Sequence, residues 1–107
     1  MTMGTDPRPS WLHEACPSWC TRTHREDDHV DDRRHQGDGE LFAVFTADGA
    51  VPGRRSVRVD VVMHLDRPVG GLHDWLRIEG TETALRLAVR RDSVPTLLAR
   101  LELVAAG

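Results

Sequence analysis

The fold is decided by residues 56–66, which read SVRVDVVMHLD. Apolar residues occupy every second position from Val57 to Leu65, and because side chains alternate across a strand, they share one face. The other face is dominated by charged and polar residues, namely Arg58, Asp60, His64 and Asp66. This period of two predicts a strand with one buried and one solvated face.

Three further strands are predicted around this one. Leu41–Thr46 is a short apolar run that ends at the turn-like pair Asp48-Gly49. Residues 72–79 and 85–89 alternate apolar and charged positions on the other side of Pro68 and two glycines. The short connections favour antiparallel neighbours.

The last predicted element is a helix. Asp92 or Ser93 suits its N-cap and Pro95 fits its first turn. Apolar residues then recur at helical spacing, at Val94, Leu97, Leu98, Leu101 and Ala105. We therefore expect an α+β fold, in which a four-stranded antiparallel β-meander carries the C-terminal helix packed across its apolar face.

The composition predicts a thin hydrophobic core. The chain has 107 residues, enough for one compact domain, and its aromatic content is 5% with no Tyr. Short chains of this kind often add a metal or a partner to order their irregular parts.

Charge and hydropathy exclude several classes of protein. Residues 1–40 carry five Arg against nine acidic residues, and residues 41–107 carry nine Arg against eight, so neither part has the basic footprint of a nucleic-acid-binding protein. No apolar run approaches the ~20 residues of a membrane span, and the first ten residues lack the apolar region of a signal peptide. We expect a cytosolic protein, in which two closely spaced cysteines bind metal or do redox chemistry.

Three regions follow from these patterns. Residues 1–10 are predicted to be a flexible leader, residues 11–40 a zinc-binding module, and residues 41–107 the sheet and helix, packed with the module as one domain. From Thr23 to Glu40 the sequence is almost entirely charged residues and histidine, so it cannot bury itself and should be a loop unless a metal pins it.

The metal-binding residues are predicted from their spacing. Cys16, Cys20 and His24 fall four residues apart, which in a short helical turn places them on one face. Two cysteines and two histidines are a recurrent structural set for Zn²⁺. The fourth ligand is open on this reasoning: His35 leads, because the loop before it is long enough to return and Gly37 and Gly39 let the chain turn away, followed by His29 and then His13.

This segment also resembles a known group of proteins. The pattern CPxWC at residues 16–20, then His24, an acidic stretch and His35-x-Gly37, is similar to small actinobacterial domains of unknown function. The resemblance implies metal binding at Cys16, Cys20, His24 and His35, and it supports His35 over His29. It implies no activity, and the C-terminal helix, which begins Ser93-Val94-Pro95, departs from the group's usual start.

The function that these features favour is a non-enzymatic regulatory or protein-interaction module with a structural Zn²⁺ and another protein as its partner. No combination of nucleophile, base and orienting group is visible, so an enzyme is not favoured. One alternative is a zinc-dependent hydrolase, in which three protein ligands leave a position for water beside Glu14 or Glu26. The other is a redox switch, in which oxidation of Cys16 and Cys20 releases the metal.

Overall fold

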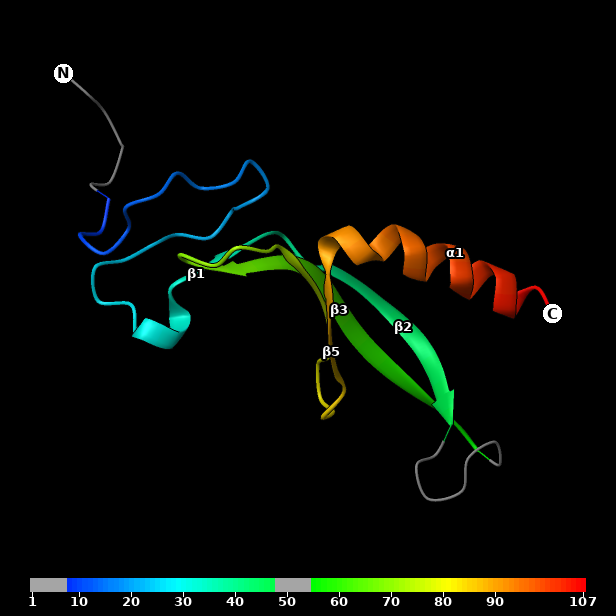
Figure 1. Ribbon diagram of the computed structural model, residues 1–107. Helices are drawn as coiled ribbons and strands as arrows, with labels where there is room; N and C mark the ends of the chain where they lie inside the picture. The colour runs from blue at the N-terminus through cyan, green and yellow to red at the C-terminus, as the bar shows by residue number, and fades with distance from the viewer. Residues whose placement is uncertain (1–7, 48–54) are drawn as a thin grey trace.

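A computed structural model describes residues 8–47 and 55–107 of the chain (Figure 1). Most of the expected leader, residues 1–7, and the expected turn at Asp48-Gly49 lie outside the described residues. The described end of the leader is held in place: Pro9 is buried and its carbonyl accepts a hydrogen bond from the amide of Leu12.

The described chain contains a sheet, two short 3-10 helices and one α-helix. The strands are β1 (Arg34–Gln36), β2 (Glu40–Ala47), β3 (Ser56–Pro68), β4 (Trp75–Gly80) and β5 (Arg86–Arg90). The helices are η1 (Val30–Asp32), η2 (Arg91–Ser93) and α1 (Val94–Ala105).

All five strands form one antiparallel sheet centred on β3. β2 pairs with residues 56–63 of β3, and β1 pairs with residues 66–68 along the same edge. β4 pairs with residues 61–66 on the opposite edge, and β5 pairs with β4. The first five residues of β3 therefore have a neighbouring strand on one edge only, whereas residues 61–63 and 66 pair with a strand on both.

The α+β class is confirmed, but the predicted number of four strands is wrong. The additional strand is β1, which lies in the segment expected to be a loop. This segment is ordered because Arg34–Gln36 pairs with the end of β3, and His35 is completely buried there. The predicted strand at residues 72–79 begins only at Trp75, and Leu72 is 91% exposed.

The two faces of β3 are not divided as the alternation predicts. Val59 and Val61 are buried as expected, but Val57 is 39% exposed. On the face expected to be solvated, His64 and Asp66 are 8% and 1% exposed. At Asp66 the reason is that this residue pairs with both β1 and β4, and Arg34 and Arg77 from these two strands bind its carboxylate.

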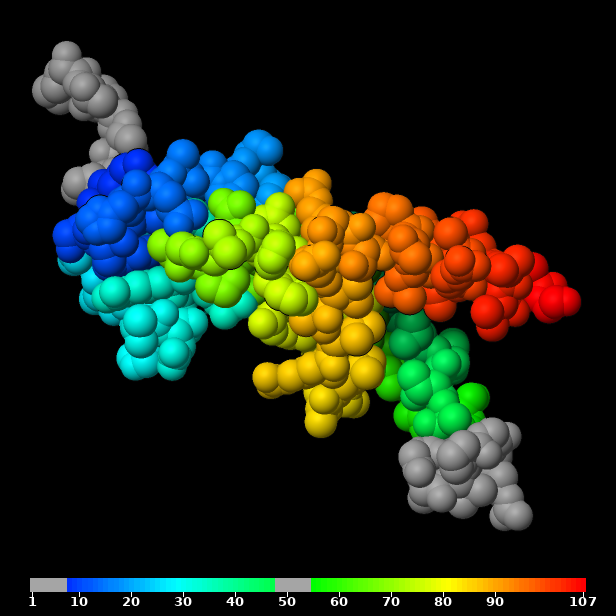
Figure 2. All heavy atoms as spheres, in the orientation of Figure 1, coloured from blue at the N-terminus to red at the C-terminus, as the bar shows by residue number. Residues whose placement is uncertain are grey.

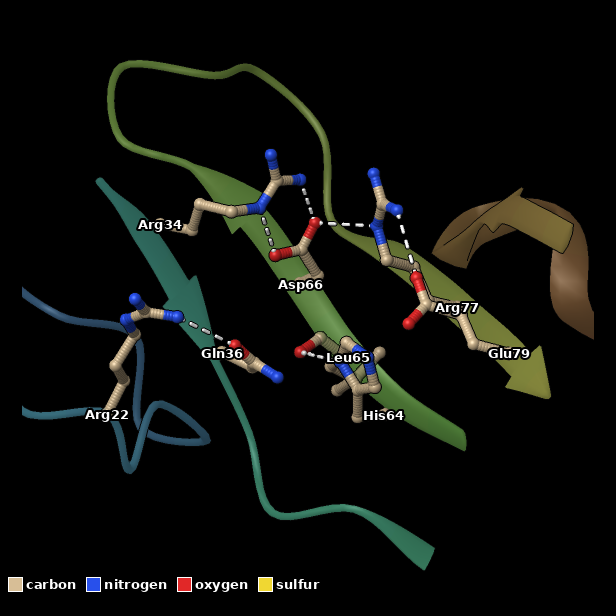
Figure 3. A network of polar contacts seen from close by, with 8 residues as sticks. All are labelled: Arg22, Arg34, Gln36, His64, Leu65, Asp66, Arg77 and Glu79. Carbon is tan, nitrogen blue, oxygen red and sulfur yellow. Dashed lines mark hydrogen bonds and ion pairs between the residues drawn. The ribbon is translucent and has the colours of Figure 1, made fainter. Parts of the chain in front are cut away.

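A polar network occupies this covered face (Figure 3). The guanidinium of Arg34 donates two hydrogen bonds to the Asp66 carboxylate, and Arg77 Nε donates a further one over 2.9 Å. Arg77 also pairs with Glu79 at 3.3 Å. Buried charge is thus matched by charge, as burial in a protein requires.

The helix begins as predicted, with Ser93 at its N-cap and Pro95 in its first turn, but its predicted packing across the sheet is wrong for the single chain. None of its residues is buried, and its exposed side chains include Leu101 at 56%. From the end of β5, α1 extends toward the same side of the view as β2, and the far ends of α1 and β2 lie apart (Figures 1 and 2). Hydrogen bonds from Arg91 to the Asp74 carbonyl and from Arg90 to Asp92 fix this exit direction. No helix in the described part of the chain is long and apolar enough to span a membrane.

Candidate metal centre

The segment that carries the two cysteines is a loop. The expected helical turn over residues 16–24 does not form; instead the amide of Cys20 donates to the carbonyl of Pro17 over 3.0 Å and closes a tight turn. The next residue, Thr21, donates its amide to the Gln36 carbonyl over 3.0 Å. This bond ties the loop to β1 and brings the cysteines beside His35.

Four side chains converge at this point. One ligand atom from each of Cys16, Cys20, His24 and His35 lies within 4.8 Å of the others. Among the residues that the structure describes, no other group of histidines, cysteines and acids clusters in this way. The same four residues were singled out by spacing and resemblance.

The spacing between these atoms suits a tetrahedral metal. Cys20 Sγ lies 3.6 Å from His24 Nε2. With bonds of about 2.3 Å to sulfur and 2.0–2.1 Å to nitrogen, two ligands of one tetrahedral Zn²⁺ lie about 3.5 Å apart. No large movement of these two side chains is needed to accept the ion.

His35 is oriented as a metal ligand would be. Its ring is fully buried, and its Nδ1 atom has no hydrogen-bond partner in the described structure. Its Nε2 atom lies 2.9 Å from Glu14 Oε2. A carboxylate on the far nitrogen of a ligating histidine fixes the ring and its tautomer and leaves the near nitrogen for the metal.

Glu14 is itself held from several sides. Its Oε1 accepts the amide of Gly70 over 2.6 Å, and Arg67 lies 3.6 Å from Oε2. Partial burial would raise the pKa of Glu14, but the hydrogen bonds from Gly70 and His35 and the charge of Arg67 lower it below its ordinary value. Glu14 is therefore a carboxylate that accepts the proton of His35 Nε2.

The surroundings of His24 and Cys16 shift the pKa values of these two side chains. Burial, followed by the charges of His35 and Arg22, lowers the pKa of His24, which favours the neutral imidazole that binds metals. Partial burial and the neighbouring Cys20 raise the pKa of the Cys16 thiol. The His24 ring also meets Trp11 edge to face, with 5.7 Å between ring centroids.

The other histidines considered for this site lie elsewhere. His29 Nδ1 accepts the amide of Asp31 over 3.2 Å, so this side chain caps η1, and it is 69% exposed. His13 is exposed and is not part of the cluster. The structure thus brings His35, and neither alternative, to Cys16 and Cys20.

Spacing did not predict the link between Glu14 and His35, which are separated by 21 residues. Glu14 was noted only as an acid close to the cysteines. The second acid noted there, Glu26, accepts the amide and the hydroxyl of Ser10, at 2.9 and 2.6 Å. Both oxygens of each of these two acids thus accept hydrogen bonds from the protein.

The chain matches, over residues 1–107, the family model described as a domain of unknown function, DUF6907, and it belongs to that family. No curated protein and no solved structure matches it. The expected membership of a family of unknown function is therefore confirmed, and its actinobacterial origin stays a prediction.

Proposed function

We propose that this member of the DUF6907 family is a cytosolic zinc-binding protein that acts as a non-enzymatic regulatory or protein-interaction module. The observation that carries the proposal is the buried, unpartnered Nδ1 of His35 beside two cysteines and a second histidine. A buried polar atom without a partner costs free energy, and a metal ion at this position removes that cost.

Zinc is the metal that suits this donor set. Thiolates and imidazoles bind Zn²⁺ in preference to the hard cations Mg²⁺ and Ca²⁺, which require oxygen ligands. Four protein ligands fill its tetrahedral shell, as in structural sites. Such an ion would join the loop of residues 16–24 to β1 through His35, with about 10 kcal/mol or more of apparent binding energy to hold it there.

The surroundings favour a structural over a catalytic ion. A catalytic zinc keeps one position for water and an acid or base close to it. Both carboxylate oxygens of Glu14 and of Glu26 accept hydrogen bonds from the protein itself. These hydrogen bonds orient both acids toward protein groups rather than toward the cluster, which favours the structural ion.

Metal analysis tests the proposal. The purified protein should contain close to one Zn²⁺ per chain, and Cys20→Ser should lose most of it. In place of Zn²⁺, Co²⁺ should give the thiolate charge-transfer absorption and the intense visible bands of a tetrahedral site with two sulfur ligands.

The matched control is His29→Ala, which removes the histidine that caps η1 rather than one at the cluster. It should keep its metal and its Co²⁺ spectrum. Equal metal content in the wild type and Cys20→Ser, or an octahedral Co²⁺ spectrum, would overturn the proposal.

A further inference from the structure

The helix α1 presents an apolar stripe that the described part of the chain leaves largely exposed. With about 100° of rotation per residue, its large apolar side chains other than Leu103 and the first-turn Pro95 fall within a band about 120° wide. Leu101 lies near the centre of this band and is 56% exposed, and Val104 is 78% exposed. The α1 stripe consists of Val94, Leu97, Leu98, Leu101, Val104 and Ala105.

The face of the sheet beside α1 is also apolar, and it is exposed at its margins. Phe42 pairs with Val61 and Leu87 lies in register with Ile78, so both point to the same side of the sheet as the buried Val61. Phe42 is 38% exposed and Leu87 48%. Where α1 begins, a groove of about 520 Å³ is lined by Leu87, Val89, Asp92, Ser93, Thr96 and Leu97.

Within the described residues, one part of the sheet that carries this face has only two strands. Residues 56–60 of β3 pair with β2 but not with β4, so this part of the sheet is a two-stranded ribbon. Two-stranded ribbons are marginally stable in water unless a further layer packs on them. Val57, on the ribbon, is 39% exposed.

The exposed area of the whole chain is large enough to leave room for a dimer interface. The chain exposes 8281 Å², whereas a compact monomer of 12.0 kDa exposes about 6000 Å². The difference exceeds the roughly 800 Å² that each partner contributes to a standard protein interface. The radius of gyration, 17.9 Å, is likewise well above the about 13 Å of a compact domain of this length.

We propose that a second copy of the chain covers this surface, with α1 of each copy lying across the apolar sheet face of the other around a two-fold axis. The twelve residues of α1 give a helix about 18 Å long, which spans the roughly 14 Å between the first and last of four neighbouring strands. Each helix then buries its stripe, and each ribbon gains the layer it lacks.

Charge permits this self-association. The two charged side chains of α1, Arg100 and Glu102, have opposite signs and flank the stripe, and β2 carries a single charge, Glu40. A two-fold interface brings each patch against its own copy, so a nearly neutral patch avoids like-charge repulsion. The inference rests on the interaction role proposed above and makes the partner of this surface the protein itself, independently of the metal.

The test is the molar mass in solution, measured by light scattering and sedimentation. The wild type should have a mass near 24 kDa, twice 12.0 kDa, at ~100 μM chain and dissociate on dilution. Leu101→Arg places a charge in the stripe and should yield the monomer. Leu103→Arg is the matched control, because Leu103 is 66% exposed on the opposite side of the same helix, and it should stay dimeric.

A sheet variant tests whether the helix crosses the sheet of the other copy. Phe42→Arg should also yield the monomer, and circular dichroism and zinc content should show that each variant is folded. A wild-type monomer at all concentrations, with a small-angle scattering radius near 13 Å, would mean that α1 folds back on its own sheet and would overturn the proposal. So would a dimer that survives Leu101→Arg or Phe42→Arg. Zinc content separates this failure from failure of the metal site, since neither variant touches a ligand.

Discussion

The two ends of the molecule are stabilised in opposite ways. At the metal end, which comprises residues 8–36 and 64–70, the buried side chains include His35, His64 and Asp66. At the apolar end, which comprises β2, residues 56–60 and α1, large hydrophobic side chains such as Phe45 and Leu98 are 73% and 55% exposed. The chain therefore buries polar groups at one end and exposes apolar groups at the other.

This difference reflects what each kind of interaction requires. Hydrogen bonds, ion pairs and metal bonds are directional, and a small number of residues of one short chain is enough to form them. Hydrophobic stabilisation grows with the apolar area removed from water. A short chain with a small core therefore gains most of this stabilisation when another layer packs on its apolar surface. The metal end thus makes most of its polar contacts within the chain, and the apolar end leaves hydrophobic area exposed that we propose a second copy covers.

Removal of the metal should have the largest effect, and it should be confined to the metal end. A chelator should release the loop of residues 16–24 and β1, because about 10 kcal/mol of apparent binding energy holds them. In a Trp75→Phe background, the emission of Trp11 and Trp19 should shift to the red, and the amides of residues 16–36 should lose protection from hydrogen exchange.

The pairing of β3 with β4 contains no ligand and should keep its protection, as should the dimer. Global unfolding on chelation would contradict this division of the molecule, because it would make the sheet depend on the metal. Unchanged tryptophan emission would mean that no metal orders the loop.

The next largest effect concerns the polar network. Asp66 is 1% exposed and binds Arg34 and Arg77, so Asp66→Asn should cost about 2–3 kcal/mol, below the full value for a buried pair because both arginines are partly exposed. Urea unfolding at neutral pH measures this cost. The control Asp60→Asn breaks an exposed pair with Arg58 and should change stability by less than about 0.5 kcal/mol.

The same pair of proteins should differ in its pH dependence. Burial would raise the pKa of Asp66, but the hydrogen bonds and charges of Arg34 and Arg77 outweigh it and hold the pKa below 3.8. A depressed pKa contributes stability that is present above pH 3.8 and is lost as the pH falls through the lower, folded-state pKa. The wild type should therefore lose its advantage over Asp66→Asn only in acid. An advantage that does not change with pH would mean that the carboxylate charge is irrelevant.

The sequence predicted the strands and the helix better than it predicted which of their side chains are buried. The alternation from Val57 to Leu65 was sufficient for a strand, because period two is a local property. It could not show that His64 and Asp66 are buried, because that depends on β1 and β4, whose register on β3 is set by pairing far along the chain. Likewise Ser93 and Pro95 marked the start of α1, but an apolar stripe indicates only that a covering surface is needed, not which chain supplies it.

The four clustered side chains were selected from the sequence, but their arrangement was not. Cysteine and histidine at close spacing are chemically distinctive, so Cys16, Cys20 and His24 could be chosen without a fold. The place of His35 depends on β1, a three-residue strand with no apolar pattern to reveal it. The partner of its far nitrogen, Glu14, could be found only in three dimensions.

A smaller effect should follow from changing that partner. Glu14→Gln keeps an oxygen near His35 but loses the charge that the Nε2 proton meets, so metal affinity should fall about 10–100-fold. Competition with a chromophoric chelator measures the affinity. Glu26→Gln is the control, because Glu26 binds Ser10 rather than a candidate ligand, and it should leave the affinity unchanged. An equal loss in both variants would indicate a general effect of charge.

The smallest effect tests how tightly the metal end is packed. Gly37 was expected to let the chain turn, but among the described glycines only Gly70 and Gly107 have positive φ. Gly37 instead allows a close approach of two segments, since a Cβ there would lie 3.1 Å from the Trp19 carbonyl oxygen. Gly37→Ala should cost about 1 kcal/mol of stability through this contact and should alter Trp19 emission. A neutral Gly37→Ala would show that the loop gives way at no cost. The contrast between the two ends would then depend on the metal and the ion pairs alone, without close packing of the loop on the sheet.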